Sequence, residues 1–226
     1  MIHYTKQQQE ILEIVDRFGI TCRSQIERYT GIKGNTVHTN LWRFEKLGLV
    51  SSLGDTRPKL FAITKAGSEL AGIISKSAIV RGIPNYAILR HIILTTDLIL
   101  YFVENFRKQG TPFEIETERE IVADLKFQQG EKNYKRPKEL LPDFIAISPH
   151  EKLAVEVELS KKTSHRIEAK LERYKAEIAA GKYTGVYYFS DKQLILDNVA
   201  AYAQYLKVPR INFLNLDQAL GKNRTI

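Results

Sequence analysis

Three acidic residues interrupt the apolar stretch from Leu140 to Lys162, and they constrain this chain more than any other feature of its sequence. The stretch is typical of two short strands joined by a turn. It places Asp143, Glu156 and Glu158 where strands favour apolar or β-branched side chains. Burying a carboxylate there is costly unless a positive charge meets it. A divalent cation is the obvious candidate, so the stretch predicts a metal-binding hairpin.

The spacing of the three acids indicates a shared face. Glu156 and Glu158 are two residues apart, so on a strand both side chains point to the same side of the sheet. If the two strands pair as a hairpin, Asp143 joins them on that side. Ligation by oxygen alone favours Mg²⁺ or Mn²⁺. Such a cation can polarise a phosphodiester and activate an attacking water, which makes the acids candidate catalytic residues.

A fourth acid and a simpler interpretation remain open at this stage. Glu118, in the segment ETERE, is a plausible further metal ligand, and Glu116 and Glu120 are its rivals. The acids of the later strand alternate with Val155 and Val157, and this pattern also suits an edge strand with one wet face. The sequence therefore predicts either a metal site or a half-exposed strand.

Composition narrows the class of protein. The chain has 226 residues and a net charge of +8, which fits a polyanionic partner such as nucleic acid. Its one cysteine, Cys22, excludes an internal disulfide and a Cys-based zinc site. The most apolar run, Ile88 to Val103, is interrupted by polar residues and is too short to span a bilayer. We expect a cytoplasmic protein without a membrane partner.

The first third of the chain predicts three helices followed by a hairpin and a fourth helix. Thr5 and Gln8 form a capping-box pattern at the first helix. The first predicted helix ends at Phe18, the second spans Ser24–Tyr29, and the third spans Thr36–Leu47 with Asn35 as its cap. Two strands, Leu49–Leu53 and Lys59–Ile63, and a helix Lys65–Ile74 follow. This order, with the segments TVHTNLWRFEKLGLV and ITKAG, resembles the winged helix-turn-helix family.

The winged-helix resemblance implies a DNA-binding face. It assigns Thr36 to Leu47 as the recognition helix, which would enter a major groove, and the hairpin turn as a wing that reaches phosphate. The expected DNA-binding residues are Thr36, Thr39, Arg43, Lys46, Arg57 and Lys59. The alternative is a solvated surface that serves protein contacts.

The rest of the chain predicts strands alternating with helices. The expected elements are a helix Tyr86–Lys108, a strand Phe113–Thr117, an exposed basic loop Phe127–Pro137, the two strands of the acidic stretch, a helix from Thr163 or Ser164 to Ala180, a strand Thr184–Ser190, a helix Gln193–Leu206 and a strand Arg210–Leu216. This order resembles the restriction-endonuclease-like core, a mixed sheet flanked by helices. We therefore predict an α/β (α+β) protein of two domains, residues 1–76 and 85–220.

The resemblance to that core covers Pro142-Asp143 and the acid-x-Lys element of the next strand. Here Glu156 is followed at the lysine position by Glu158. Lys161 and Lys162, just past the strand, and Lys170 on the next helix are candidates to replace the missing lysine, and the first two also suit a solvated helix start. Of these lysines we predict Lys162 as the catalytic one.

Both halves in this order resemble the replication-relaxation family, which includes MobC-type relaxases. The matching positions are His91, Glu118, Pro142-Asp143, and Glu156, Glu158, Ser160, Lys162, Lys170 and Tyr174 in an E-x-E-x-S-x-K and K-x-x-x-Y pattern. The resemblance implies a protein that nicks duplex DNA at a plasmid or integrative-element origin through a Mg²⁺ or Mn²⁺ site. It also implies relaxosome or replication proteins as partners, and a lone winged helix often acts as a homodimer.

Two further hypotheses belong to other functional classes. In the first, the winged helix binds DNA and the nuclease-like domain is an inactive scaffold for mobilisation or replication partners, because activity does not follow from fold. In the second, the chain is a transcription regulator whose second domain senses a ligand.

Overall fold

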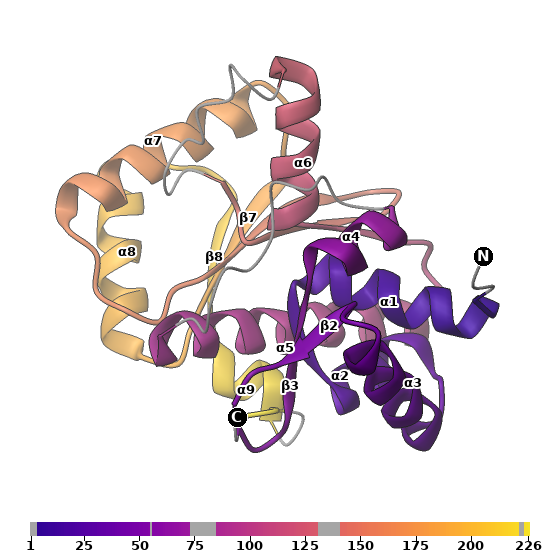
Figure 1. The fold of residues 1–226 in the computed structure, drawn as a ribbon. Helices are drawn as coiled ribbons and strands as arrows, with labels where there is room; N and C mark the ends of the chain where they lie inside the picture. Colours follow the sequence, from indigo (N-terminus) through magenta and orange to yellow (C-terminus); the bar gives the residue numbers. More distant parts are fainter. Residues whose placement is uncertain (1–3, 55, 73–84, 131–140, 222–223) are drawn as a thin grey trace. The chain divides into compact units, whose positions relative to one another are not determined.

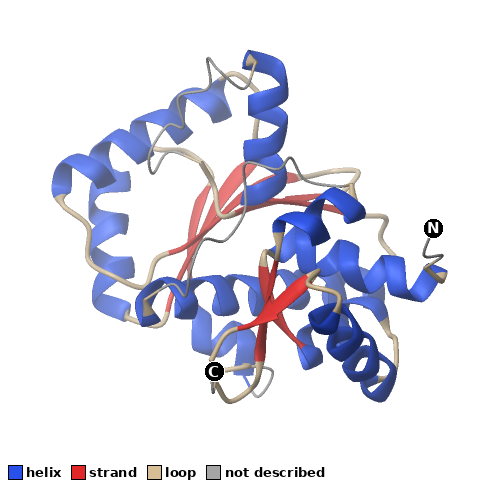
Figure 2. Ribbon diagram, in the orientation of Figure 1, coloured by secondary structure: helices blue, strands red, loops and turns tan. Residues whose placement is uncertain are grey.

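The computed structural model describes residues 4–54, 56–72, 85–130, 141–221 and 224–226. Within these ranges the protein is a mixed α+β structure with a three-stranded antiparallel sheet and a five-stranded mixed sheet, which Figures 1 and 2 show, and the predicted fold class is confirmed. Its contacts form two compact units. Unit 1 holds the described residues up to Leu100, those from Arg119 to 130, and Thr225–Ile226; unit 2 holds the others. The domain boundaries 1–76 and 85–220 stay a prediction.

Unit 1 begins with the predicted order of helices and hairpin. Its elements are α1 (Lys6–Phe18), β1 (Ile20–Cys22), α2 (Arg23–Thr30), α3 (Gly34–Lys46), β2 (Val50–Ser52), β3 (Leu60–Ile63) and α4 (Lys65–Ala71). The capping box of Thr5 and Gln8 starts α1 as expected. Three strands pair antiparallel in the order β1-β3-β2. The winged helix therefore has one strand more than the sequence predicted.

Two local predictions in this unit were wrong. Helix α3 begins at Gly34 with Lys33 at its N-cap, rather than at Thr36 after a cap by Asn35. Val37, Leu41 and Phe44 are buried as its core face, but Leu47 is 42% exposed because the helix has ended before it. The predicted end of α4 at Ile74 lies outside the described residues.

The first half of helix α5 (Tyr86–Gln109) packs in unit 1. Leu89 and Ile93 join an apolar cluster with residues of the three-stranded sheet, among them Ile20, Cys22 and Leu60. Burial of these side chains removes apolar surface from water and attaches the helix to the winged helix.

A buried polar network also ties α5 to α2. The side-chain amide of Gln25 donates to the Ile93 carbonyl at 3.1 Å and to Asp97 Oδ1 at 2.9 Å. Asp97 is fully buried and also accepts from the backbone N–H of Thr225 at 2.7 Å. Burial raises the pKa of Asp97, while the bonds from Thr225 and Gln25 oppose that rise.

Helix α5 is long and apolar enough, by length and composition, to cross a membrane. Its mean hydropathy over the most apolar window is 1.5, and 56% of that window is buried inside the protein. Core helices of soluble proteins meet the same criterion, so this is weak evidence for a membrane span. The apolar run Ile88 to Val103, which by itself is too short to span a bilayer, is only part of this helix, whose predicted range of Tyr86–Lys108 agrees with the structure to one residue.

Unit 2 contains the five-stranded sheet in the order β4-β5-β6-β7-β8. Its elements are β4 (Glu114–Thr117), β5 (Phe144–Ile147), β6 (Lys152–Val157), α7 (Ser164–Ala179), β7 (Gly185–Ser190), α8 (Gln193–Tyr205), β8 (Ile211–Asn215) and α9 (Leu216–Leu220). The first three strands pair antiparallel, and β6, β7 and β8 pair parallel. The hairpin predicted within the acidic stretch is thus confirmed as β5 and β6.

One helix between β4 and β5 was missed. Helix α6 (Glu118–Gln129) starts within ETERE, so the expected loop is helical from Phe127 to Gln129, and the part of that loop from 131 onward lies outside the described residues. Two arginine contacts hold α6 to α1 within unit 1. Arg17 Nε lies 2.7 Å from Glu120 Oε1, and Arg119 Nε donates to the Asp16 carbonyl at 2.8 Å. The interleaved charges of α6 gave little apolar periodicity from which to predict it.

The two faces of the unit 2 sheet carry different side chains. On one face, which we call the aromatic face, Phe102 of α5 contacts Phe144 and Phe189, with ring centroids 5.5 and 6.2 Å apart. On the other, which we call the carboxylate face, Tyr174 of α7 lies edge-on to Tyr188 at 6.5 Å. Glu156 is the register partner of Tyr188 and shares that face.

Candidate functional site: a buried carboxylate, lysine and tyrosine

Glu156 lies near the end of β6, on the carboxylate face, with its side chain only 4% exposed. Both of its carboxylate oxygens have partners from α7. Lys170 Nζ donates to Oε2 at 2.6 Å, and the Tyr174 hydroxyl donates to Oε1. Lys170 and Tyr174 are four residues apart, so one turn of a helix presents both side chains on the same face. The buried charge of Glu156 is therefore met by an ammonium group.

The environment changes how these groups titrate. Burial raises the pKa of Glu156 to about 7, although Lys170 opposes that rise and nearby Asp143 adds to it. The pKa of the Lys170 ammonium is raised, because Glu156, Asp143 and Glu158 together outweigh the effect of its burial. The pKa of Tyr174 is raised well above its ordinary value by burial and by Glu156. The raised pKa brings Glu156 toward the neutral range in which general acids and bases operate.

Asp143 lies directly before β5 and beside the end of β6. Its Oδ2 accepts from the backbone N–H of Val157 at 2.7 Å, and its own N–H donates to the Val155 carbonyl at 3.0 Å. Its carbonyl accepts from the backbone N–H of Glu118 at 3.0 Å. The hairpin register thus brings Asp143 near Glu156, as the sequence predicted.

Glu158 lies beyond the end of β6, which stops at Val157. Its Oε1 lies 3.3 Å from Lys162 Nζ and accepts from the Ser160 N–H at 3.3 Å. Glu158, Lys162, Arg166 and Lys170 line one small pocket of about 30 Å³ next to the buried cluster. Lys162 therefore neutralises Glu158, while Lys170 is the lysine that contacts Glu156.

The four candidate acids do not come together as a divalent-metal site. Of the described residues, no three His, Cys, Asp or Glu side chains are placed to hold one metal ion, and Asp143, Glu156, Glu158 and Glu118 all belong to the described part. Lys170 and Tyr174 already occupy the Glu156 oxygens. The arrangement therefore does not fit a metal cage made by these four acids, because an ammonium supplies the positive charge that the sequence assigned to a cation.

Sequence reasoning missed the pairing of Glu156 with Lys170 and Tyr174, although it noted each residue separately. Tyr174 is fully buried. The signal was the K-x-x-x-Y spacing on a predicted helix that follows the acidic strand, since one turn separates the two donors.

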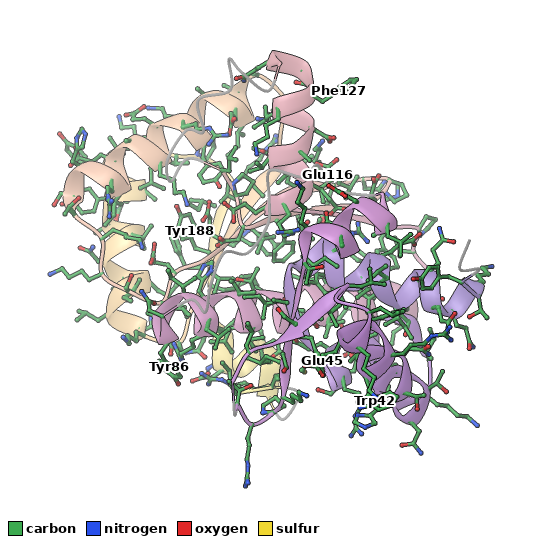
Figure 3. All side chains as sticks on the ribbon, in the orientation of Figure 1. Trp42, Glu45, Tyr86, Glu116, Phe127 and Tyr188 are labelled. Carbon is green, nitrogen blue, oxygen red and sulfur yellow. The ribbon has the colours of Figure 1, made fainter. Side chains whose placement is uncertain are left out.

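The predicted DNA-binding residues lie on the surface of unit 1. Thr39, Arg43 and Lys46 are exposed along α3, and Thr36 is partly exposed near its start. Lys46 Nζ lies 3.7 Å from the centroid of the Trp42 ring, which is 53% exposed. Figure 3 labels Trp42 and Glu45 on this helix. The exposed face of α3 thus combines hydrogen-bonding, basic and aromatic groups.

The wing carries the two remaining basic candidates. Arg57 and Lys59 are exposed and, with Ser52, Gly54 and Thr56, line an open hollow of about 520 Å³. Lys59 Nζ lies 3.2 Å from Glu45 Oε2, and this ion pair joins the wing to α3. Arg57 is therefore the better placed of the two to meet a phosphate.

A comparison with protein families agrees with the sequence order and the fold. The model of the replication-relaxation family matches residues 12–191, which run from within α1 to the end of β7. The chain belongs to the replication-relaxation family. A comparison with curated proteins found no match to this chain.

Membership of the replication-relaxation family indicates a role in replication or mobilisation. The buried cluster lies within the matched range, and so do the exposed residues of α3 and the wing. Three residues of the replication-relaxation pattern are in direct contact in the structure, since Lys170 and Tyr174 both donate hydrogen bonds to Glu156.

Proposed function

We propose that this protein binds duplex DNA at the replication or transfer origin of a plasmid or integrative element, in the cytoplasm, as a component of the replication or mobilisation machinery. The observation that carries the proposal is the exposed face of α3, where Thr39, Arg43 and Lys46 lie on the helix that follows the turn of a winged helix. In that fold this helix enters the major groove, and its side chains reach base edges and phosphates. Relaxosome or replication proteins and a second copy of the chain are the protein partners we propose.

The electrostatics of α3 support the proposal. Glu45 is the only acid on the helix, and it faces the wing, since Oε1 accepts from the Ser52 N–H at 3.2 Å and Oε2 meets Lys59. The Ser52 bond, followed by Lys59, holds the pKa of Glu45 below its ordinary value despite some burial. The carboxylate therefore stays paired, and no acid of α3 is left to repel a phosphate backbone.

Fluorescence anisotropy with duplex fragments of the origin tests DNA binding. Arg43→Ala should weaken binding roughly 5- to 150-fold, as expected when one base contact of about 1–3 kcal/mol is lost. Arg57→Ala should lower the salt dependence by about one counterion. Lys6→Ala, an exposed basic residue of α1, is the matched control. Equal affinities for all three variants and the wild type would exclude α3 and the wing as the DNA-binding surface.

Metal-dependent nicking is the second candidate function, and a specific observation favours it. Asp143 directly precedes β5 and Glu156 lies on the adjacent strand β6, while Lys170 supplies from α7 the lysine that β6 lacks. We propose Mg²⁺ or Mn²⁺ as the cofactor of this activity, with Asp143 and Glu156 as the metal ligands. Metal binding would require Lys170 to leave Glu156 Oε2, and for this reason we propose the accessory DNA-binding protein ahead of the nickase.

A nicking assay separates the two candidates. The purified protein is incubated with supercoiled origin plasmid and either Mg²⁺ or Mn²⁺, and open circles are quantified. Nicking that is lost in Asp143→Asn and Glu156→Gln, with duplex binding retained, would establish the nickase. Duplex binding without open circles would leave the accessory protein, and nicking that persists in both variants would show that another site performs it.

A further inference from the structure

A groove of about 440 Å³ lies on the aromatic face of the unit 2 sheet, on the side opposite Glu156. It is bounded by the second half of α5, by β6, β7 and β8, and by α9. Nothing in the proposed DNA-binding or nicking functions uses this groove. Its volume falls in the range of 300–1,000 Å³ that is typical of small-molecule sites.

Five aromatic side chains line the groove. Tyr101, Phe102 and Phe106 come from α5, and Tyr187 and Phe189 come from β7. The rings contact one another edge-on or tilted, with centroids 5.8 Å apart for Tyr101 and Phe102 and 6.4 Å apart for Tyr187 and Phe189. The rings are thereby fixed in place before anything binds, and planar molecules pack well against such surfaces.

Side-chain amides line the groove together with the aromatic rings. Asn105, Gln109 and Gln218 line the groove, and their side chains form no hydrogen bond with any described residue. Each amide offers both donors and an acceptor. Concave sites with a few converging polar groups on an apolar wall are typical of ligand pockets, where those groups fix the orientation of the ligand.

The charges of the groove restrict its ligand. Of its described lining residues none is a lysine or arginine, and the single charged one is Glu151. A phosphate or other anion would lose its hydration there without gaining a counter-charge. The groove therefore differs in kind from the DNA-binding surface of α3 and from the lysine-lined pocket beside Glu158.

We propose that this groove binds an uncharged planar aromatic molecule, with its ring on Tyr187 and Phe106 and its polar atoms on the amides of Asn105, Gln109 and Gln218. The site adds a ligand-binding function to a DNA-binding protein. It is independent of nicking, since its residues lie on the opposite face of the sheet from the carboxylate cluster.

Two fluorescent probes that differ by one charge test the proposal on the full chain. N-phenyl-1-naphthylamine is uncharged, and 8-anilinonaphthalene-1-sulfonate has the same ring system with a sulfonate added. The uncharged probe should bind at least roughly tenfold more tightly than the sulfonate. Gln218→Lys places an ammonium at the exposed rim and should tighten the sulfonate selectively, without strengthening the uncharged probe.

A blocking variant locates the binding. Ala219→Trp adds a ring inside the groove and should weaken the uncharged probe at least roughly tenfold, whereas Gln204→Trp, on the exposed surface of α8, should leave it unchanged. Circular dichroism shows that both variants are folded. Absence of probe binding, equal binding of the sulfonate, or full binding by folded Ala219→Trp protein would each overturn the proposal.

Discussion

The two faces of the unit 2 sheet differ in chemistry although the same strands build both. In β7, Tyr188 points to the carboxylate face, while its neighbours Tyr187 and Phe189 point to the aromatic face. Figure 3 labels Tyr188 on this strand. Alternation along a strand thus lets one segment support a buried ion pair on one side and a groove lined by aromatic rings on the other. We therefore expect variants of the two faces to differ in how much stability they lose when one contact partner is removed, and in how that loss depends on pH.

One of the two largest expected effects is on the carboxylate face. Glu156→Ala leaves the Lys170 ammonium and the Tyr174 hydroxyl without their buried partner, and we expect a loss of about 3–5 kcal/mol in the free energy of unfolding, measured with urea. The double variant Glu156→Leu/Lys170→Met should recover most of that loss, because apolar side chains of similar volume replace the pair. A double variant as unstable as the single one would contradict this account.

Phe102→Ala makes the corresponding change on the aromatic face. Phe102 contacts four other rings, and its truncation leaves a cavity that should cost about 3–5 kcal/mol. The loss should be the same at pH 5 and pH 8, because no titrating group is removed. A pH-dependent loss would show that the two faces are coupled.

Glu156 should make folding stability depend on pH in an unusual direction for an acid. Its pKa is about 7 in the folded protein against an ordinary value of 4.5, so between these two values the folded state holds a proton that the unfolded chain has released. Stability from this group is therefore complete below pH 4.5 and is lost as the pH rises to 7, by about 1.4 kcal/mol for each pKa unit. To measure this loss, the urea midpoints of the wild type and of Glu156→Gln are compared from pH 4.5 to 8. A difference between the two midpoints that does not change with pH would contradict the raised pKa.

Tyr174 and Tyr188 offer a smaller, matched test within the carboxylate face. Tyr174→Phe removes the hydroxyl that donates to Glu156 and should cost about 1–3 kcal/mol. Tyr188→Phe removes a hydroxyl that forms no hydrogen bond with any described residue, so thermal unfolding should change little. Equal shifts would mean that the Glu156 contact contributes nothing specific.

The smallest effect is expected where the carboxylate face meets water. The pair of Glu158 and Lys162 is partly exposed, with Lys162 36% exposed, and exposed pairs typically contribute about 0–1 kcal/mol. Lys162→Ala should therefore unfold within about 1 kcal/mol of the wild type. If that variant lost as much stability as Glu156→Ala, the network would extend past Lys170.

The sequence was informative where periodicity and caps are strong. The α1 cap and the β5–β6 hairpin were both predicted, since local patterns specify them. Helix α6 and strand β1 were missed, because the first has mixed charges and the second is three residues long. The choice between a cation and Lys170 as the counter-charge of Glu156 depends on helix packing across the sheet, which no local pattern specifies.

Helix α5 has a practical consequence for anyone who divides this chain into fragments. Leu89 and Ile93 cover apolar side chains of the three-stranded sheet, and Asp97 binds Gln25 of α2. A fragment that ends after α4 would leave that apolar surface in water and the buried Gln25 without its acceptors. An expression fragment intended to isolate the DNA-binding half should therefore continue at least to Leu100, and a shorter one should be prone to aggregation.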